Sequence, residues 1–398
     1  MPQYYKYKES GCDFRVREGL RDGALVKDQS LTITAFNGIE NTDWIEMDEV
    51  IHFVPQKPEA LTVVALDSTH IDLEWTNIEI LGEGVSIERT AVAGGGNGWT
   101  EIGTVDIGIE EYHDSGLTAG TTYYYRLKSI IGTAYSEASD VANTFTHHSE
   151  LVTYTTGLTT PLSTNRKNSI NTFIQSLKSG LSITLLSEVF DCMYLLNGET
   201  QESALKNLIK DAHHCTAEDS IGFSANNGFI GDGTHGYLDT HYNPNTQGIR
   251  HLLNDCSISA NLTNVMNSLY DIQISDFANK PFSGICAYTV SPFLFGFLND
   301  GYYDAYSSQE PLKCVGGGGL IIITRNGGSY ANMFGYRNKT NITSYPAISN
   351  QMPTVSNGNM KLVNFSTRRM SFAFAGKHIT TAMRDIIADA LTAYISSL

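Results

Sequence analysis

The chain has little charge, and most of what it has is negative. Only 17% of its 398 residues are Asp, Glu, Lys or Arg, and the formal net charge is −16. Proteins that bind nucleic acid neutralise phosphates with clustered Lys and Arg, which an acidic chain does not supply. We therefore expect no nucleic-acid partner.

Cysteine is also sparse, and its spacing carries no metal motif. The six cysteines include no Cys-x-x-Cys pair, so neither a zinc site nor a disulfide framework is indicated, and buried free thiols are expected. Histidines occur in His213-His214-Cys215 and at His235 and His241. Neighbouring strand residues face opposite ways and no second ligand pair follows at zinc spacing, which favours surface histidines.

Long apolar runs are missing. No window holds the ~18 consecutive apolar residues of a membrane-spanning helix. The N-terminal residues 1–9 also lack the apolar segment of a signal peptide. We expect no membrane insertion, and synthesis in a cytoplasm without export.

Catalytic signatures are missing as well. Gly-x-Ser-x-Gly does not occur, and the glycine run at 316–319 leads into a strand former without Lys-Ser/Thr, which excludes a phosphate loop. Glu46, Asp48 and Glu49 are superficially similar to the Glu-x-Asp-x-Glu strand of retaining jelly-roll glucanases. Here Glu49 falls one residue early and points away from the other two, so we expect a solvated acidic face and no enzyme.

What the chain has in quantity is glycine and aromatics. It contains 36 Gly, 21 Tyr and 17 Phe, a composition typical of β-sandwiches with many turns. The predicted fold class is mainly β, in tandem sandwiches with a few peripheral helices. We predict a small β docking segment at 1–57, a sandwich at 58–146, a linker at 147–165 and a larger sandwich at 166–398.

Residues 58–146 show the spacing of a seven-strand sandwich. Ile71, Leu73 and Trp75 alternate toward one face, which places Trp75 in the core. Tyr123 follows Gly120 by three residues, at the position of a tyrosine corner whose hydroxyl bonds back to the upstream turn. Over its whole length this segment resembles a fibronectin type III domain, a module that acts as a spacer or docking surface.

The following region combines helical and alternating patterns. Apolar residues at helical spacing predict a helix that ends in a glycine cap before Gly180, a short helix over 200–210 capped by Thr200, and a terminal helix over 383–395. Alternating runs at 223–229 and 237–242 flank a glycine turn and predict a β-hairpin.

In that turn Gly231 and Gly233 suit positive-φ positions. Further alternating runs as far as residue 374 suit a two-sheet jelly roll.

The sequence of residues 228–244 resembles a motif of a known protein family. Gly-Phe-x-Gly-x-Gly-Thr-x-Gly-Tyr-Leu-x-Thr-x-Tyr-Asn-Pro is similar to the opening hairpin of the concanavalin A-like (laminin-G-like) jelly rolls of tailed-phage virion proteins. The likeness extends over 166–398. It implies a structural virion component of the tail, collar or fibre, in several copies within a symmetric assembly, that docks other virion proteins and contacts host-surface glycans.

Two other functions stay open at this point. One is a glycan depolymerase with its carboxylates on separate strands. The other is a bacterial surface adhesin, which would require an export signal.

Oxygen-rich side chains near the glycine turn suggest a metal site. Asp232, Asp239 and Asn243, with carbonyl oxygens of the turn, are ligand types that calcium prefers. Their spacing matches no EF-hand, and turn formation by Asp and Asn explains the same residues. Calcium is the one cofactor considered; no other is expected.

Tyrosines beside amides form the other candidate site. Aromatic rings with neighbouring amides stack on and hydrogen-bond sugars, and the same residue types populate protein interfaces. We favour the interface reading for this set: Tyr302, Tyr303, Tyr330, Asn332 and Tyr336.

Overall fold

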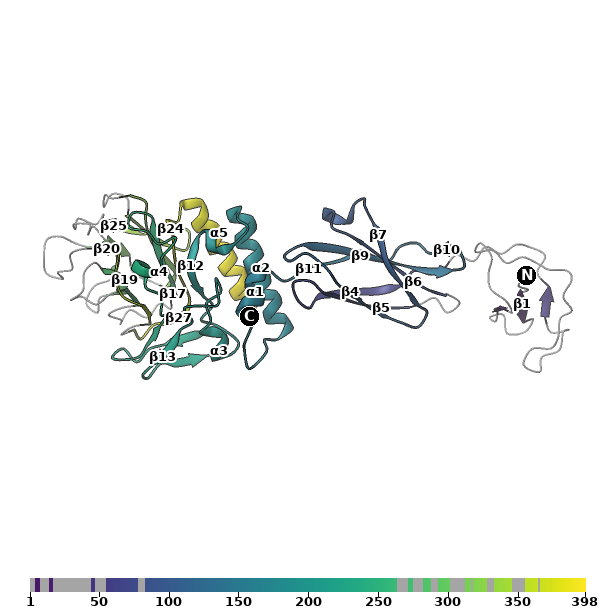
Figure 1. Cartoon of the computed structure of the whole chain (residues 1–398), viewed down its shortest axis with the longest axis horizontal. Coiled ribbons are helices and arrows are strands. Elements are labelled where there is room, and N and C mark those ends of the chain that lie inside the picture. Colours follow the sequence, from purple (N-terminus) through teal and green to yellow (C-terminus); the bar gives the residue numbers. More distant parts are fainter. Residues whose placement is uncertain are drawn as a thin grey trace. The chain divides into compact units, whose positions relative to one another are not determined.

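The computed structural model divides into two compact units, Met1–His147 and His148–Leu398, drawn in Figure 1. Among the described residues no helix has the length and apolarity to cross a membrane. The structure describes residues 4–7, 14–16, 44–46, 55–77, 83–262, 271–274, 282–287, 293–300, 312–315, 318–327, 333–345, 355–363 and 366–398.

The first unit begins with a three-stranded antiparallel sheet. Its order is β2-β1-β3, from Phe14–Val16, Tyr4–Tyr7 and Trp44–Glu46. Apolar patterning in the sequence predicts strands at 13–17, 31–36 and 44–54. Strands β2 and β3 lie within the first and last of these ranges, β1 was not predicted, and residues 31–36 lie outside the described residues.

Residues 59–145 form the first sandwich, with a three-stranded and a five-stranded antiparallel sheet. The orders are β4-β5-β8 and β10-β9-β6-β7, with β11 also paired to β9. This confirms the predicted fibronectin type III-like sandwich. The strands are β4 Glu59–Ala65, β5 Ile71–Thr76, β6 Gly84–Thr90, β7 Thr100–Asp106, β8 Glu111–Asp114, β9 Thr122–Ile131, β10 Ala134–Tyr135 and β11 Ala142–Phe145.

Alternation along β9 builds the core of this sandwich. Tyr123, Tyr125 and Leu127 point inward, and Trp75 from β5 is buried among them at 4% exposure, as predicted. The Tyr123 hydroxyl accepts the N–H of Thr118 at 3.1 Å, so the predicted tyrosine corner is present.

The second unit starts earlier than its sequence suggested. The polar segment 147–165, expected to be a linker, contains α1, Ser149–Thr155, and the buried side chains Leu151, Tyr154 and Leu162. These three contribute to the core beneath the helices, so the segment belongs to the second unit from His148 onward. Three apolar residues separated by polar ones give too weak a pattern to reveal this from the sequence.

Two antiparallel sheets of eight strands, counted within the described residues, form the second sandwich. The sheet that we call inner has the order β14-β15-β27-β17-β22-β23-β24, with β12 on β27; the outer sheet has the order β13-β16-β26-β18-β19-β20-β21-β25. The inner strands are β12 Phe190–Tyr194, β14 Gly222–Ser224, β15 Gly228–Ile230, β17 Cys256–Leu262, β22 Gly319–Arg325, β23 Met333–Arg337, β24 Thr340–Asn341 and β27 Arg369–Gly376. The outer strands are β13 Thr216–Glu218, β16 Tyr237–Asp239, β18 Ile272–Ile274, β19 Phe282–Ala287, β20 Phe293–Asp300, β21 Leu312–Val315, β25 Thr343–Tyr345 and β26 Met360–Leu362.

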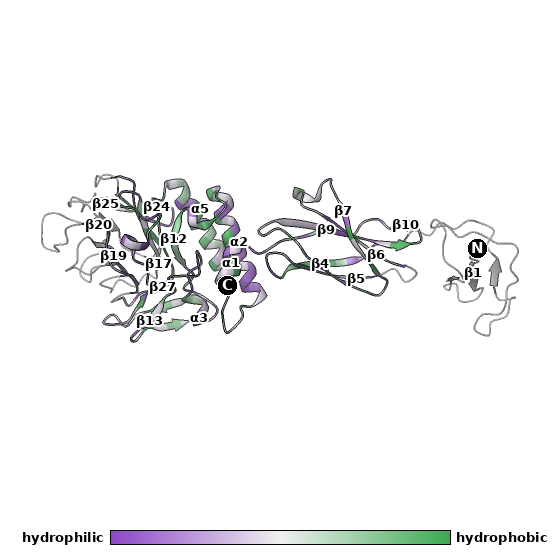
Figure 2. Cartoon of the chain, viewed as in Figure 1, coloured by the Kyte–Doolittle hydropathy of each residue, from purple (hydrophilic) through white to green (hydrophobic). Residues whose placement is uncertain are grey.

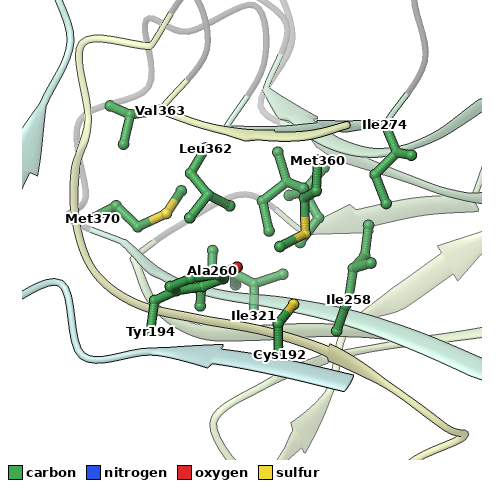
Figure 3. Close-up of a cluster of buried hydrophobic side chains, with 14 of the residues drawn as sticks. Cys192, Tyr194, Ile258, Ala260, Ile274, Ile321, Met360, Leu362, Val363 and Met370 are labelled. Carbon is green, nitrogen blue, oxygen red and sulfur yellow. The ribbon is translucent and has the colours of Figure 1, made fainter. Parts of the chain in front are cut away.

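The inner sheet is apolar on both faces. Successive residues of β27 enter different cores: Ala373 and Ala375 face the outer sheet, whereas Phe372 and Phe374 face the helices. Figure 3 shows the core between the sheets, where Met360 and Leu362 of β26 point toward residues of the inner sheet.

A helical layer covers the second face of the inner sheet. It consists of α1, α2 at Thr164–Leu181 and α5 at Thr381–Ser396 (Figure 1). Figure 2 shows hydrophobic and hydrophilic residues mixed along these helices, as expected for helices with one buried face. The predictions of mainly β structure, tandem sandwiches and peripheral helices are confirmed.

Helix ends agree with the sequence in part. Thr380 caps α5 and Thr200 caps α3, which is only Gln201–Ala204, much shorter than predicted. Helix α2 continues through Gly180 to Leu181, and its C-cap is Ser182, whose φ of 54° is left-handed. Gly180 is needed for close packing, because a Cβ there would lie 2.5 Å from the Ile386 side chain.

The glycine turn connects the two sheets and does not close a hairpin. Strand β15 pairs with β14 and β27 in the inner sheet, whereas β16 pairs with β13 and β26 in the outer sheet. The chain can cross here because Gly231 passes so close to the backbone of Ser366 that a Cβ would lie 2.5 Å from its carbonyl oxygen. Only Gly233, at φ +80°, has the predicted positive φ.

The tyrosine corner gives a test of the first sandwich. Tyr123→Phe leaves the Thr118 N–H without its acceptor, so we expect the free energy of unfolding to fall by about 1–2 kcal/mol. Urea unfolding followed by circular dichroism measures it. The control is Tyr124→Phe, one residue away on the opposite face of β9; equal effects of the two variants would contradict a specific role for the corner.

Candidate docking site

The predicted contact tyrosines fall into two groups. Tyr336 on β23 is only 6% exposed, and the Arg384 guanidinium of α5 lies 4.8 Å from its ring centre. Its prediction as a surface contact is therefore wrong, because its face of the inner sheet is covered by the helical layer. The remaining members lie outside the described residues: Tyr302, Tyr303, Tyr330 and Asn332.

Each of the proposed calcium ligands is engaged in hydrogen bonds with nearby backbone N–H groups. Asp232 Oδ1 accepts the N–H groups of residues 234, 235 and 236, and these bonds hold its pKa well below the usual range. Asp239 Oδ1 accepts the N–H of His241 and an amide N–H of Asn359. Asn243 caps α4, Pro244–Gln247. Within the described ranges no three His, Cys, Asp or Glu side chains gather as metal ligands do.

The histidine motifs are likewise bound locally. His213 Nδ1 lies 3.0 Å from the His241 carbonyl oxygen, and His214 Nδ1 accepts the N–H of Asn207. Cys215 is buried, and burial raises the pKa of its thiol. Of the acidic motif, the backbone at Glu46 belongs to β3, whereas residues 48 and 49 lie outside the described part of the chain.

A buried carboxylate that the sequence did not single out organises one loop of the second sandwich. Asp191 is 3% exposed and lies at an irregularity of β12, where the register against β27 shifts between Phe190 and Cys192. Such a bulge lets one residue leave the regular alternation and aim its side chain elsewhere.

The Asp191 carboxylate accepts hydrogen bonds from four donors. Oδ1 accepts the N–H of Ile249 at 3.0 Å, both oxygens accept that of Arg250 at 3.0 Å, and Oδ2 accepts that of His251 at 2.7 Å. Oδ2 also accepts the buried Tyr242 hydroxyl at 2.8 Å. Burial and the neighbouring anions raise the pKa of Tyr242, so it remains a donor. We call this arrangement the Asp191 clamp.

His251 anchors the clamped loop from inside. Its ring is fully buried, and Nδ1 lies 3.3 Å from the Ser257 carbonyl oxygen, which assigns the proton to Nδ1. Nε2 has no hydrogen-bond partner within the described structure. Burial lowers the pKa of His251 to about 4, so the ring is neutral at neutral pH.

The clamped loop presents aliphatic side chains to solvent. Ile249 is 68% exposed and Leu252 is 48% exposed. Arg250 Nε donates to the Ser187 carbonyl oxygen at 2.8 Å, which joins the loop to the segment that carries Leu185, also 48% exposed. Apolar side chains held on a rigid backbone at a surface are typical of protein contact sites.

One signal in the sequence could have pointed to the clamp. Asp191 is the single charged residue within the apolar run 189–196, and a carboxylate in a buried strand needs compensating donors. The donors themselves, three successive backbone N–H groups some sixty residues later, leave no trace in side-chain pattern.

Comparisons with known proteins found fibronectin type III domains among solved structures. No family model matches the chain, and no curated protein matches it. Solved structures similar to it include a Fn3-like protein from Clostridium thermocellum, at 26% identity over 23% of this chain and 91% of that one, with a TM-score of 0.20. The FN5 domain of Drosophila Lar matches at 23% identity over 23% and 97%, with a TM-score of 0.20.

The FN1-FN3 domains of chicken CNTN1 match at 18% identity over 23% of this chain and 30% of theirs, with a TM-score of 0.22. These scores carry no argument by themselves. The assignment of a fibronectin type III-like sandwich rests on the order of its own sheets.

The clamp predicts a local effect on exchange. Asp191→Ala removes the acceptor of three successive backbone N–H groups, so we expect amide exchange at 249–251 to accelerate and stability to fall by roughly 3 kcal/mol. Hydrogen exchange by NMR or mass spectrometry measures it. The matched control is Asp232→Ala, an exposed carboxylate that also accepts three successive N–H groups, where a smaller loss of stability and unchanged exchange at 249–251 are expected. Unchanged protection at 249–251 in Asp191→Ala would refute the clamp.

The buried His251 ring should make the stability of the second unit depend on pH. The unfolded ring has a pKa near 6.5 and the folded one a pKa of about 4, so the folded state binds fewer protons between these values. Its contribution to stability is complete above pH ~6.5 and is lost as the pH falls toward ~4, by roughly 3 kcal/mol. Unfolding curves give the free energy of unfolding of wild type and of His251→Leu. Between pH 7 and pH 4 the wild-type value should fall by this amount more than that of the variant. His235→Gln, on an exposed loop, should keep the wild-type slope; a parallel slope for His251→Leu as well would show that the ring does not titrate in this range.

Proposed function

We propose that this chain is a non-catalytic structural component of a tailed-phage virion, in the tail, collar or fibre, that docks other virion proteins. The observation that carries the docking role is the Asp191 clamp, which fixes a loop whose Ile249 and Leu252 side chains face solvent. A loop that is already ordered loses little conformational entropy when a partner covers it. The similarity of residues 228–244 to phage jelly rolls supports the virion assignment.

The chemistry of the described polar groups also supports a scaffold. Asp191, Asp271 and Asp114 are buried carboxylates, and each is compensated by donors from its own unit: backbone N–H groups, Arg368 at 2.9 Å, and Arg89 at 2.7 Å. Catalytic acids need a path to substrate, whereas these groups face partners inside the fold. Neither glycan cleavage nor export as an adhesin is favoured by any contact within the described residues.

The proposal is tested on particles. Tailed phage grown from, or induced in, the bacterium that encodes this chain would be purified on a density gradient and probed with an antibody to the full chain. We expect the chain at constant stoichiometry in the particle band and at one symmetric position by electron microscopy. A chain found only in the soluble fraction would overturn the virion assignment.

A glycan array probed with the purified full chain separates the alternatives. The docking proposal expects no glycan signal above that of a heat-unfolded control. Release of reducing sugar from capsular polysaccharide would favour the depolymerase instead.

A further inference from the structure

The clamped loop carries a cation, Arg250, between the exposed aliphatic residues Ile249 and Leu252 in the sequence. We define the Arg250 surface as Leu185, Ile249, Arg250 and Leu252. Arg250 is half-buried, and its Nε is fixed on the Ser187 carbonyl oxygen at 2.8 Å. Its two Nη groups make no hydrogen bond within the part of the chain that the structure describes.

Glu188, an acid that interacts electrostatically with Arg250, makes no hydrogen bond to its guanidinium within the described residues. Glu188 lies close enough to feel the Arg250 charge, but its Oε1 accepts the N–H of Thr184, the hydroxyl of Thr184 and the N–H of Leu185. These bonds lower the pKa of Glu188 and hold it on its own turn. The outer edge of the Arg250 guanidinium therefore remains available to a partner.

The surroundings of Arg250 favour one kind of ligand group. A guanidinium fixed at Nε offers its two Nη groups as a planar fork, which matches a carboxylate in bidentate geometry. Aliphatic neighbours exclude water once the surface is covered, which strengthens such a pair. Because the whole chain carries a net charge of −16, a broadly acidic partner would be repelled, whereas a single carboxylate among aliphatic residues would not.

We propose that the Arg250 surface docks a segment of another protein that presents one Asp or Glu carboxylate between aliphatic side chains. The carboxylate pairs with the Nη groups of Arg250, and its aliphatic neighbours cover Ile249, Leu252 and Leu185. The Asp191 clamp holds the backbone of residues 249–251 in place before the partner arrives. This inference names the partner chemistry of the proposed docking role and rests on it.

Peptides on an array test this chemistry without particles, so its failure and that of the virion assignment are distinguishable. One series holds nine-residue peptides with a central Asp or Glu flanked by Leu, Ile or Val; the matched series has Asn or Gln at the centre. We expect the labelled full chain to prefer the carboxylate series by about tenfold or more. Equal binding to both series, or binding to neither, would overturn the proposal.

Substitutions test whether the preference for carboxylate peptides comes from the Arg250 surface. Arg250→Gln should abolish it, Arg250→Lys should retain part of it as a monodentate cation, and Ile249→Asp should weaken binding by repulsion and lost apolar contact. Lys339→Ala and Ile395→Asp alter an exposed cation and an exposed aliphatic residue elsewhere on the second unit and should leave it unchanged. Protection of amides 249–251 from exchange shows that each variant keeps the loop. A preference that survives Arg250→Gln would refute the assignment.

Sedimentation of the wild-type chain tests whether a second copy of this chain binds the Arg250 surface instead. Self-association that Arg250→Gln abolishes would assign the surface to a second copy of this chain and overturn the proposal. A monomer at the concentrations used on the array supports it.

Discussion

The second unit depends on one sheet that has to be covered on both faces. In the inner sheet, alternate residues of β12, β22 and β27 are apolar in both directions, so neither face tolerates water. The outer sheet covers one face and the helical layer covers the other. A strand in this position has no solvent-facing side on which a polar side chain could be placed at low cost, which makes each polar residue within it informative.

Asp191 is such a residue, and its position connects the core with the surface. The bulge in β12 takes it out of the alternation, and its carboxylate replaces lost hydration with three backbone N–H groups and a tyrosine hydroxyl. The donors lie on a loop, so the compensation that the core requires also orders Ile249 and Leu252 at the surface. The rigidity of the proposed docking site is in this sense a consequence of burial.

Features that follow from a repeating pattern could be predicted from the sequence. Features that depend on one contact between distant residues could not. The buried Trp75 and the tyrosine corner at Tyr123 follow from alternation and spacing, and the structure confirms them. The glycines at 231 and 233 were recognised as special, but their task is to let the chain change sheets, which depends on the approach of Ser366 more than a hundred residues later. Tyr336 was misjudged because a strand buried on both faces shows no polar side in its sequence.

The same reasoning explains why the buried acids of the described chain hold segments of the fold together. A buried carboxylate is stable only when donors surround it, and donors that surround it also block access to it. Asp271 illustrates this: fully buried, it accepts the Ser366 hydroxyl at 2.8 Å and pairs with Arg368 at 2.9 Å, which fixes the segment against which Gly231 packs. In contrast, the Arg250 side chain is secured through Nε only, and its two Nη groups make no hydrogen bond within the described residues. Among these charged groups it is the one whose hydrogen-bonding capacity the described chain leaves partly unused, which is why we propose a role in recognition for it.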